Sequence, residues 1–218
     1  MKLGIVIPYY RNSTQCEINF RLLMDVLEKQ IVNRDDTLLV VVEDGQCSGW
    51  LEDYKSDSIV VISNLINMGV SHTRNVGLSY VINRGCEYVL FIDSDDMIDS
   101  NCIFKIMDRL YISDFDIYEM HYFINNVMKE YRIDDIRSSA CGSVIKADLI
   151  GNLRFNESLQ IGEDTLFMKQ LYDRNGVLSK CDVNTNYYYN LGSNLNSLTM
   201  RHLRHEIGIE RSDDNEMS

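Results

Sequence analysis

The sequence predicts an α/β fold built on a central, mostly parallel sheet that is flanked by helices. Short, continuous apolar runs rich in Val, Ile and Leu alternate with stretches of helical apolar spacing as far as residue 99. Apolar runs without polar alternation are typical of strands that helices cover on both faces. The composition, with 45% hydrophobic and 25% charged residues, is that of an ordinary folded chain. The length of 218 residues favours one domain with two lobes.

Four apolar runs and two amphipathic segments define the first half of the chain. The strands are expected at residues 4–7, 38–42, 59–62 and 88–92, with helices at 18–29 and 70–83. Pro8 stops the first run, and Asp44 and Asp93 lie where the second and fourth runs end. This order of elements predicts a nucleotide-binding type of α/β unit.

The second half is less regular. Helical spacing predicts helices at residues 102–111 and 164–174, and β-rich segments predict strands at 117–124, 177–180 and 185–189. These elements form the smaller lobe. The segment 206–218 is acidic and lacks aromatic residues, so we expect it to be disordered.

The charge balance argues against several partners. Asp and Glu number 33 against 21 Lys and Arg, which gives a net charge of −12. General nucleic-acid backbone binding depends on clustered cations, and anionic membranes repel such a chain, so both are disfavoured. No apolar run approaches the ~18 residues of a membrane span, and the chain is expected to be cytoplasmic. The six cysteines lack zinc-like or C-x-x-C spacing, which favours reduced thiols.

Acidic residues gather after the strands. In parallel sheets the carboxyl ends of neighbouring strands share one edge, where ligands bind. Asp44 and the run Asp93-Ser94-Asp95 therefore lie at that edge, where they repel one another unless a cation or hydrogen-bond donors neutralise them. Asp-x-Asp after a buried strand suits Mn²⁺ or Mg²⁺, which take carboxylate and phosphate oxygens. Asp-rich strand ends also form turns and helix caps, which is the alternative.

Six segments resemble the motifs of one enzyme family, in the same order. They are VIPYY at 6–10, VVEDG at 41–45, NMGVSHTRNVGL at 67–78, FIDSDD at 91–96, LRFNE at 153–157 and GEDTLF at 162–167. Together they resemble a family 2 glycosyltransferase over residues 3 to about 171. The resemblance implies the glycosyltransferase-A type of fold, in which a Rossmann-like, mostly parallel sheet is joined to a smaller acceptor-side subdomain. Residues 1–99 would then bind the sugar donor, and residues 100–205 would form the acceptor side.

The same resemblance implies an activity. It is metal-dependent, inverting transfer of a sugar from a nucleotide diphosphate donor, most often a UDP-sugar, to a hydroxyl of a glycan, a lipid-linked glycan or another acceptor. Two alternatives stay open, which are a catalytically inactive binding or scaffold protein and a transferase acting on modified phage DNA bases. The sequence does not indicate an oligomeric state. A P-loop and a dinucleotide-binding fingerprint are both missing from the sequence.

The resemblance also assigns residues to the donor site. They are Pro8, Tyr9, Tyr10, Arg11, Asp44, Asn67, Arg74, Asp93 and Ser94. Asp44 would accept a hydrogen bond from the N–H edge of the base, and Asp93 would contact the ribose or the diphosphate. Arg74 would pair with phosphate through its planar guanidinium, while a solvated cation on a helix face is the alternative.

Acidic residues are the main candidates for metal binding and catalysis. By the resemblance, Asp95 would hold Mn²⁺ or Mg²⁺ together with Asp93. His202 is a further candidate ligand for the metal or the diphosphate, or else an ordinary exposed histidine. Asp164 is the candidate general base and Glu163 its neighbour on the acceptor side, the alternative being ordinary carboxylates at the start of a helix.

Overall fold

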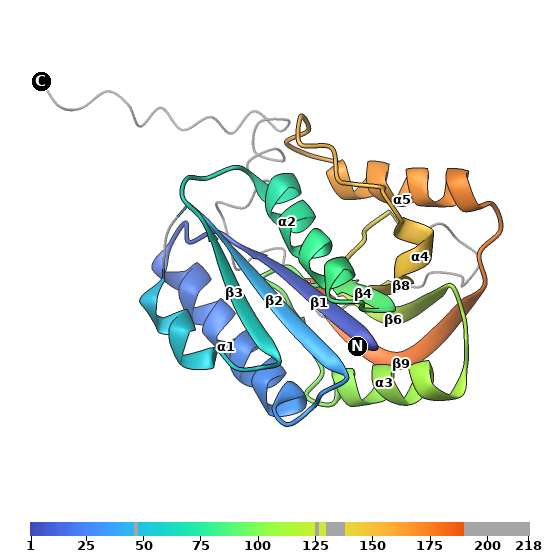
Figure 1. Cartoon of the computed structure of the whole chain (residues 1–218), viewed down its shortest axis with the longest axis horizontal. Coiled ribbons are helices and arrows are strands. Elements are labelled where there is room, and N and C mark those ends of the chain that lie inside the picture. Colours follow the sequence, from blue (N-terminus) through green and yellow to red (C-terminus); the bar gives the residue numbers. More distant parts are fainter. Residues whose placement is uncertain (46–47, 125–126, 130–137, 190–218) are drawn as a thin grey trace, which may run out of the picture.

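The protein folds into one twisted sheet with helices on both faces, as a computed structural model shows (Figure 1). The structure describes residues 1–45, 48–124, 127–129 and 138–189. Their nine strands run in the order β3-β2-β1-β4-β8-β6-β9-β5, and β7 pairs with β6. The strands are β1 (Leu3–Tyr9), β2 (Thr37–Asp44), β3 (Ile59–Asn64), β4 (Tyr88–Phe91), β5 (Met97–Ile98), β6 (Ile117–Ile124), β7 (Val127–Lys129), β8 (Ser143–Lys146) and β9 (Lys180–Tyr189).

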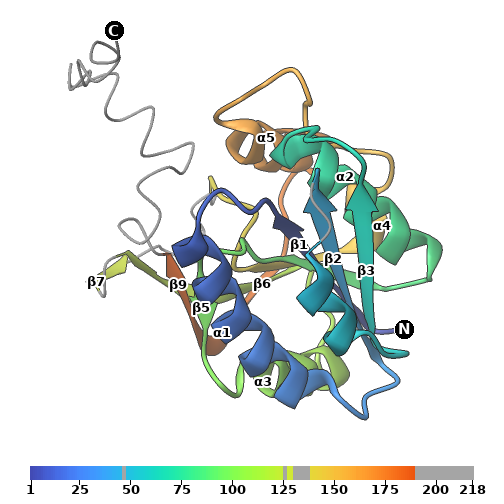
Figure 2. The same cartoon turned by 90° about the vertical axis from the view of Figure 1, so that its left-hand side faces the viewer.

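Helices form the outer layers. They are α1 (Thr14–Ile31), α2 (Val70–Asn83), α3 (Cys102–Ile112), α4 (Ala147–Ile150), α5 (Glu163–Asn175) and a 3₁₀ turn, η1 (Gly49–Tyr54). α1 and α3 cover one face of the sheet, and α2, α4 and α5 cover the other (Figures 1 and 2). Among the described residues, no helix is long and apolar enough to cross a bilayer.

The first half matches the sequence prediction closely. β3, β2, β1 and β4 are all parallel, and α2 spans the predicted residues 70–83. α1 begins earlier than predicted, at Thr14, because Ser13 caps it by accepting a hydrogen bond from Cys16 N at 3.1 Å. Gly77 lets α2 approach the sheet, since a Cβ there would lie 2.4 Å from Val6 Cγ1. This close contact sets the height of α2 above the carboxyl ends of β1 and β2.

The second half departs from the prediction in two places. β8 is an antiparallel strand between β4 and β6 that apolar periodicity did not reveal, because it has only four residues. The predicted strands at 177–180 and 185–189 are one strand, β9, so the separate strand at 177–180 is wrong. A bulge interrupts its pairing with β6, and Asn184 takes a φ of 54° there. Val177 precedes β9 and is fully exposed.

Five cysteines lie in the described residues, and all are free, as expected for reduced thiols. The predicted disordered tail at 206–218 lies outside the residues that the structure describes.

Candidate functional site

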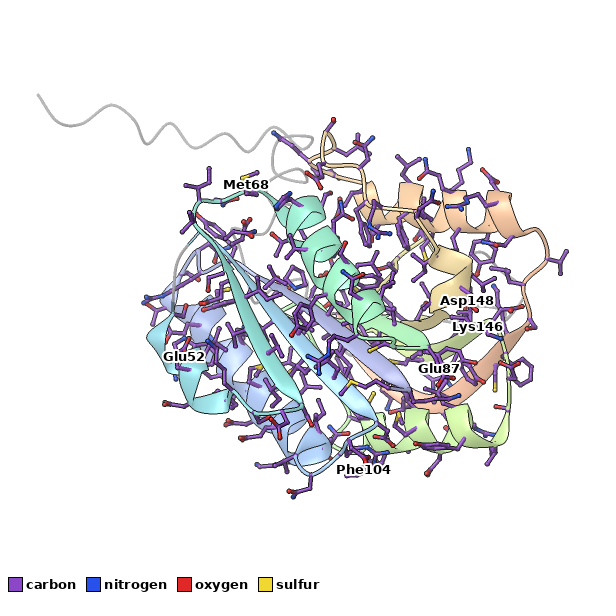
Figure 3. The ribbon with its side chains drawn as sticks, viewed as in Figure 1. Glu52, Met68, Glu87, Phe104, Lys146 and Asp148 are labelled. Atoms are coloured by element: carbon purple, nitrogen blue, oxygen red, sulfur yellow. The ribbon has the colours of Figure 1, made fainter. Side chains whose placement is uncertain are left out.

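The carboxyl ends of the parallel strands and the first turns of two helices meet at one edge of the sheet. Figure 3 places Met68, which follows β3, and Glu87, which precedes β4, at opposite ends of the sheet. The edge near Met68 is the carboxyl edge. The amino-terminal ends of α2 and α5 lie at the same edge (Figure 1).

Arg74, on α2, joins the two halves of the chain at this edge. Its Nη2 lies 2.6 Å from Asp93 Oδ1, and its Nη1 lies 2.7 Å from Glu163 Oε1. The Arg74 side chain is only 4% exposed, so the alternative of a solvated cation on a helix face is wrong. Burial opposes its charge, but Asp93 and Glu163 outweigh burial and raise the pKa of Arg74 well above its usual value. Arg74 is therefore a permanent buried cation between two carboxylates.

Asp164 follows Glu163 in the first turn of α5. Its Oδ1 accepts a hydrogen bond from Thr165 N at 2.8 Å. Burial raises the pKa of the Asp164 carboxyl above its usual value, against the opposing charge of Arg74, and Glu163 and Asp93 push the pKa in the same direction as burial. The carboxylate is therefore a stronger base than that of an ordinary aspartate.

A cluster of aromatic and amide contacts holds α5 in this position. Asn75, next to Arg74 on α2, donates to Phe155 O at 2.9 Å and accepts from Phe155 N at 2.8 Å. It also donates to Glu157 at 2.9 Å, and Glu157 lies 3.0 Å from His72 Nδ1. The Phe155 ring stacks on Phe167 of α5, with centroids 4.2 Å apart. The segment before α5 is thus fixed to α2.

A tyrosine of β9 forms two hydrogen bonds with the acidic turn that follows β4. Asp96 N donates to Asp93 O at 3.1 Å, which closes the turn. Tyr187 of β9 donates its hydroxyl hydrogen to Asp96 Oδ2 at 2.6 Å and accepts from Asp93 N at 3.1 Å. Asp93, Ser94 and Asp95 are half-buried, whereas Asp96 is 1% exposed. The sequence analysis did not assign Tyr187 to the site, because its partners Asp96 and Asp93 lie 91 and 94 positions away in the sequence.

Asp44, at the end of β2, anchors the segment that leads into α2. Its carboxylate accepts from Met68 N and Gly69 N, both at 2.8 Å, and from Asn64 Nδ2 at 3.1 Å. Asn67 is exposed, and its Oδ1 accepts from Gly69 N at 3.0 Å. Asp44 is 4% exposed, so in this structure its polar contacts are made to its own chain.

The four residues predicted to open the donor site divide into two pairs. Pro8 and Tyr9 belong to β1 and are buried, and the Tyr9 ring packs on Phe20 with centroids 4.3 Å apart. Burial raises the pKa of Tyr9 to about 12. Tyr10 is 41% exposed, and Arg11 forms a surface ion pair with Glu17. Pro8 and Tyr9 therefore support the loop on which Tyr10 and Arg11 are presented.

The residues predicted to hold a metal have the right chemistry but form no complete cage. Within the described part of the chain, no group of three or more His, Cys, Asp or Glu side chains is arranged to hold an ion. The oxygens of Asp93 and Asp95 suit a hard cation that takes its other ligands from phosphate and water. His202 lies outside the described residues.

Comparisons with known proteins bear on the family and the fold of this chain. The profile of Glycosyl transferase family 2 matches residues 5–173. The crystal structure of S. aureus TarS 1-349 in complex with UDP is similar, with a TM-score of 0.73 at 20% identity over 98% of this chain and 74% of that chain. The complex of TarS 1-349 with UDP-GlcNAc has a TM-score of 0.72 at 22% identity, over 87% of this chain and 58% of that one. No match was found among curated proteins.

A longer TarS structure shares the same fold with this chain. Its TM-score is 0.72 at 22% identity, and the match covers 87% of this chain but only 37% of that one. The sheet order and flanking helices confirm the predicted glycosyltransferase-A type of fold. Because the family profile extends from β1 into α5 and includes Arg74, Asp93 and Asp164, this chain belongs to glycosyl transferase family 2.

Proposed function

We propose that this chain transfers a sugar from a nucleotide diphosphate donor, specifically a UDP-sugar, to a hydroxyl acceptor with inversion at the anomeric carbon. The observation that carries the proposal is the Arg74 bridge. It brings Asp93 of the donor half and Glu163 of the acceptor half onto one guanidinium, next to an Asp164 whose pKa is raised. Family membership and the similarity to TarS, whose structures contain UDP and UDP-GlcNAc, support the choice of donor.

The donor binds along the carboxyl edge of β1, β2 and β4. Tyr10 and Arg11 lie on the exposed loop after β1, where an aromatic ring and a cation suit a base and a phosphate. Asp44 keeps Asn67 in place by holding the backbone of Met68 and Gly69. Asp93 and Ser94 line the turn on which the ribose and the diphosphate rest.

Asp95, with Asp93, would hold Mn²⁺ or Mg²⁺ through carboxylate oxygens. When bound, the ion neutralises charge on the departing diphosphate. The Arg74 guanidinium also orients the Asp93 side chain through the 2.6 Å contact between Nη2 and Oδ1. Oxygen ligands from one or two carboxylates are sufficient for these ions when phosphate supplies the rest.

Asp164 acts on the acceptor. Its carboxylate takes the proton of the acceptor hydroxyl while that oxygen bonds to the anomeric carbon, and the bond from carbon to diphosphate oxygen breaks with its electron pair on the leaving group. A single displacement of this kind inverts the anomeric centre. Glu163 holds Arg74 and, through its charge, helps to raise the pKa of Asp164.

The direct test combines ligand binding with product analysis. The chain would be incubated with UDP, UDP-GlcNAc, UDP-glucose and other nucleotide sugars, with and without Mn²⁺, and its unfolding midpoint would be recorded. A ligand at ~100 times its Kd adds about 2.7 kcal/mol, which shifts the midpoint by several degrees. We expect a metal-dependent shift with uridine nucleotides, and NMR of the product should show inversion.

Three other outcomes would each contradict one part of the proposal. Equal shifts of the unfolding midpoint with nucleotides of every base would contradict a uridine donor. Shifts that are the same in Mn²⁺ and in EDTA would contradict the metal site. Binding of UDP-sugar without transfer or hydrolysis in a screen of glycan and lipid-linked acceptors would favour a binding protein. For variants of Asp164, Asp173→Asn is a suitable control, because Asp173 is an exposed carboxylate on the same helix as Asp164.

A further inference from the structure

Tyr187 contacts the acidic turn with both functions of its hydroxyl. The O–H donates to Asp96 Oδ2 at 2.6 Å, and the oxygen accepts from Asp93 N at 3.1 Å. These residues are separated by more than 90 positions in the sequence. The turn follows β4 and Tyr187 lies on the last described strand, so this contact, like the Arg74 bridge, joins the two halves of the chain.

The Tyr187 side chain is itself held rigidly. It is fully buried, and its ring stacks on Tyr122 of β6 with centroids 5.4 Å apart and planes at 4°. Tyr122 and Tyr187 are also paired in the register of β6 and β9.

We propose that Tyr187 is a positioning residue that fixes the turn of Asp93, Ser94 and Asp95 for metal-assisted binding of the sugar donor. The inference rests on the proposed function and adds a residue to it. Tyr187 acts by holding the backbone of Asp93 and the carboxylate of Asp96, which are the first and last residues of the turn that carries the proposed ligands Asp93 and Asp95.

The physical reason is that short turns have few constraints of their own. The Asp96 N–H bond to Asp93 O closes the turn, but it does not set the turn's position relative to the sheet. Without the Tyr187 hydroxyl, Asp93 N loses a partner and Asp96 loses a donor in a buried place, so the turn must move or rotate. Removing groups that orient metal ligands typically weakens metal binding about 10- to 100-fold.

Tyr118 provides a matched control. It is also a fully buried tyrosine, and its hydroxyl likewise donates once, to Ser113 O at 2.7 Å, and accepts from a backbone amide, Phe115 N at 3.0 Å. Its contacts lie in the loop between α3 and β6, away from the acidic turn. Tyr187→Phe and Tyr118→Phe therefore remove the same chemical group, with one backbone amide donor, from two buried sites, and a general loss of stability should affect both.

The experiment measures binding of Mn²⁺ by electron paramagnetic resonance titration in the presence of UDP, together with the unfolding midpoint of each variant. We expect Tyr187→Phe to weaken Mn²⁺ binding about 10- to 100-fold. Tyr118→Phe should bind Mn²⁺ like the parent chain while lowering the midpoint by a similar amount. Equal Mn²⁺ affinity for the two variants would overturn the inference and leave the proposed function standing. If the parent chain itself bound no Mn²⁺ with UDP, the metal-dependent function and this role of Tyr187 would both fail.

A second pair of variants tests the same contact from the other side and does not require Tyr187→Phe to fold. Asp96→Asn keeps an oxygen that accepts from Tyr187, whereas Asp96→Ala removes it. We expect Asp96→Ala, but not Asp96→Asn, to weaken Mn²⁺ binding as Tyr187→Phe does. The double variant Tyr187→Phe/Asp96→Ala should bind Mn²⁺ no more weakly than Tyr187→Phe alone, because Tyr187→Phe already removes the contact to Asp96. Parental Mn²⁺ affinity in Asp96→Ala would contradict the inference.

Discussion

Arg74 Nη1 and Glu163 Oε1 lie 2.7 Å apart, although 89 positions separate the two residues in the sequence. The contact joins the first turns of α2 and α5 and is closed to solvent, since the two side chains are 4% and 11% exposed. Asp93 occupies the other side of the same guanidinium. The site is therefore organised around one buried cation.

Removing the Arg74 cation should lower the free energy of unfolding much more than removing a surface cation does. Arg74→Leu leaves Asp93 and Glu163 without their shared partner, and breaking a buried ion pair typically costs about 3–5 kcal/mol. Lys55→Leu is the control, because Lys55 pairs with Glu52 at the same 2.7 Å but at an exposed position. It should cost at most about 1 kcal/mol. Urea unfolding followed by the fluorescence of the single tryptophan, Trp50, measures both. Similar costs for the two variants would contradict the buried bridge.

Asp164→Asn should lower activity without lowering stability. Loss of a general base lowers kcat by about 10²- to 10⁴-fold. The folded protein raises the pKa of Asp164 above 3.8, so this group's contribution to stability is full below 3.8 and is lost as pH rises through the folded-state pKa. At neutral pH the variant should be at least as stable as the parent, because it removes a charge that burial disfavours. Parental transfer rates in Asp164→Asn would show that another group is the base.

The fall of kcat/KM at low pH should reflect protonation of the Asp164 carboxyl. In the proposed mechanism transfer requires ionised Asp164, so kcat/KM should rise with pH through a midpoint above the ordinary value of 3.8. Glu163→Gln removes a negative charge that raises the pKa of Asp164, so the midpoint should move to lower pH. Asp173→Asn should leave the midpoint unchanged. A midpoint that does not respond to Glu163→Gln would contradict the electrostatic coupling between the two carboxyls.

Gly77 should tolerate no side chain. A Cβ there would lie 2.4 Å from Val6 Cγ1 and 3.3 Å from Val42 Cγ2, which would force α2 away from the sheet. We expect Gly77→Ala to destabilise the protein by about 1–3 kcal/mol, the usual cost of overpacking. Gly49 has no atom within 4 Å of such a Cβ and is the matched control. The comparison is made by thermal unfolding, and an unchanged midpoint for Gly77→Ala would show that the contact is looser than described.

Much of the first half of the chain could be predicted because its signals are local. The apolar runs and helical spacing of residues 4–92 lie within each element, and α2 has the predicted bounds of 70–83. The acidic residues after β2 and β4 could be placed at one edge because parallel strands bring their carboxyl ends together. The family resemblance also rested on short local segments, four in this half and two at 153–157 and 162–167, and the family profile confirms it.

The rest depended on partners distant in the sequence. The sequence determined which residues were acidic, basic or aromatic, but only the tertiary structure decided that Arg74 is buried between Asp93 and Glu163 and that Tyr187 holds Asp96. β8 and the single long β9 were also set by pairing with β4 and β6, and their own residues carry too little periodicity to reveal it. The physical reason is that a side chain's burial and pKa depend on the groups packed around it, and here those groups come from segments that only folding brings together.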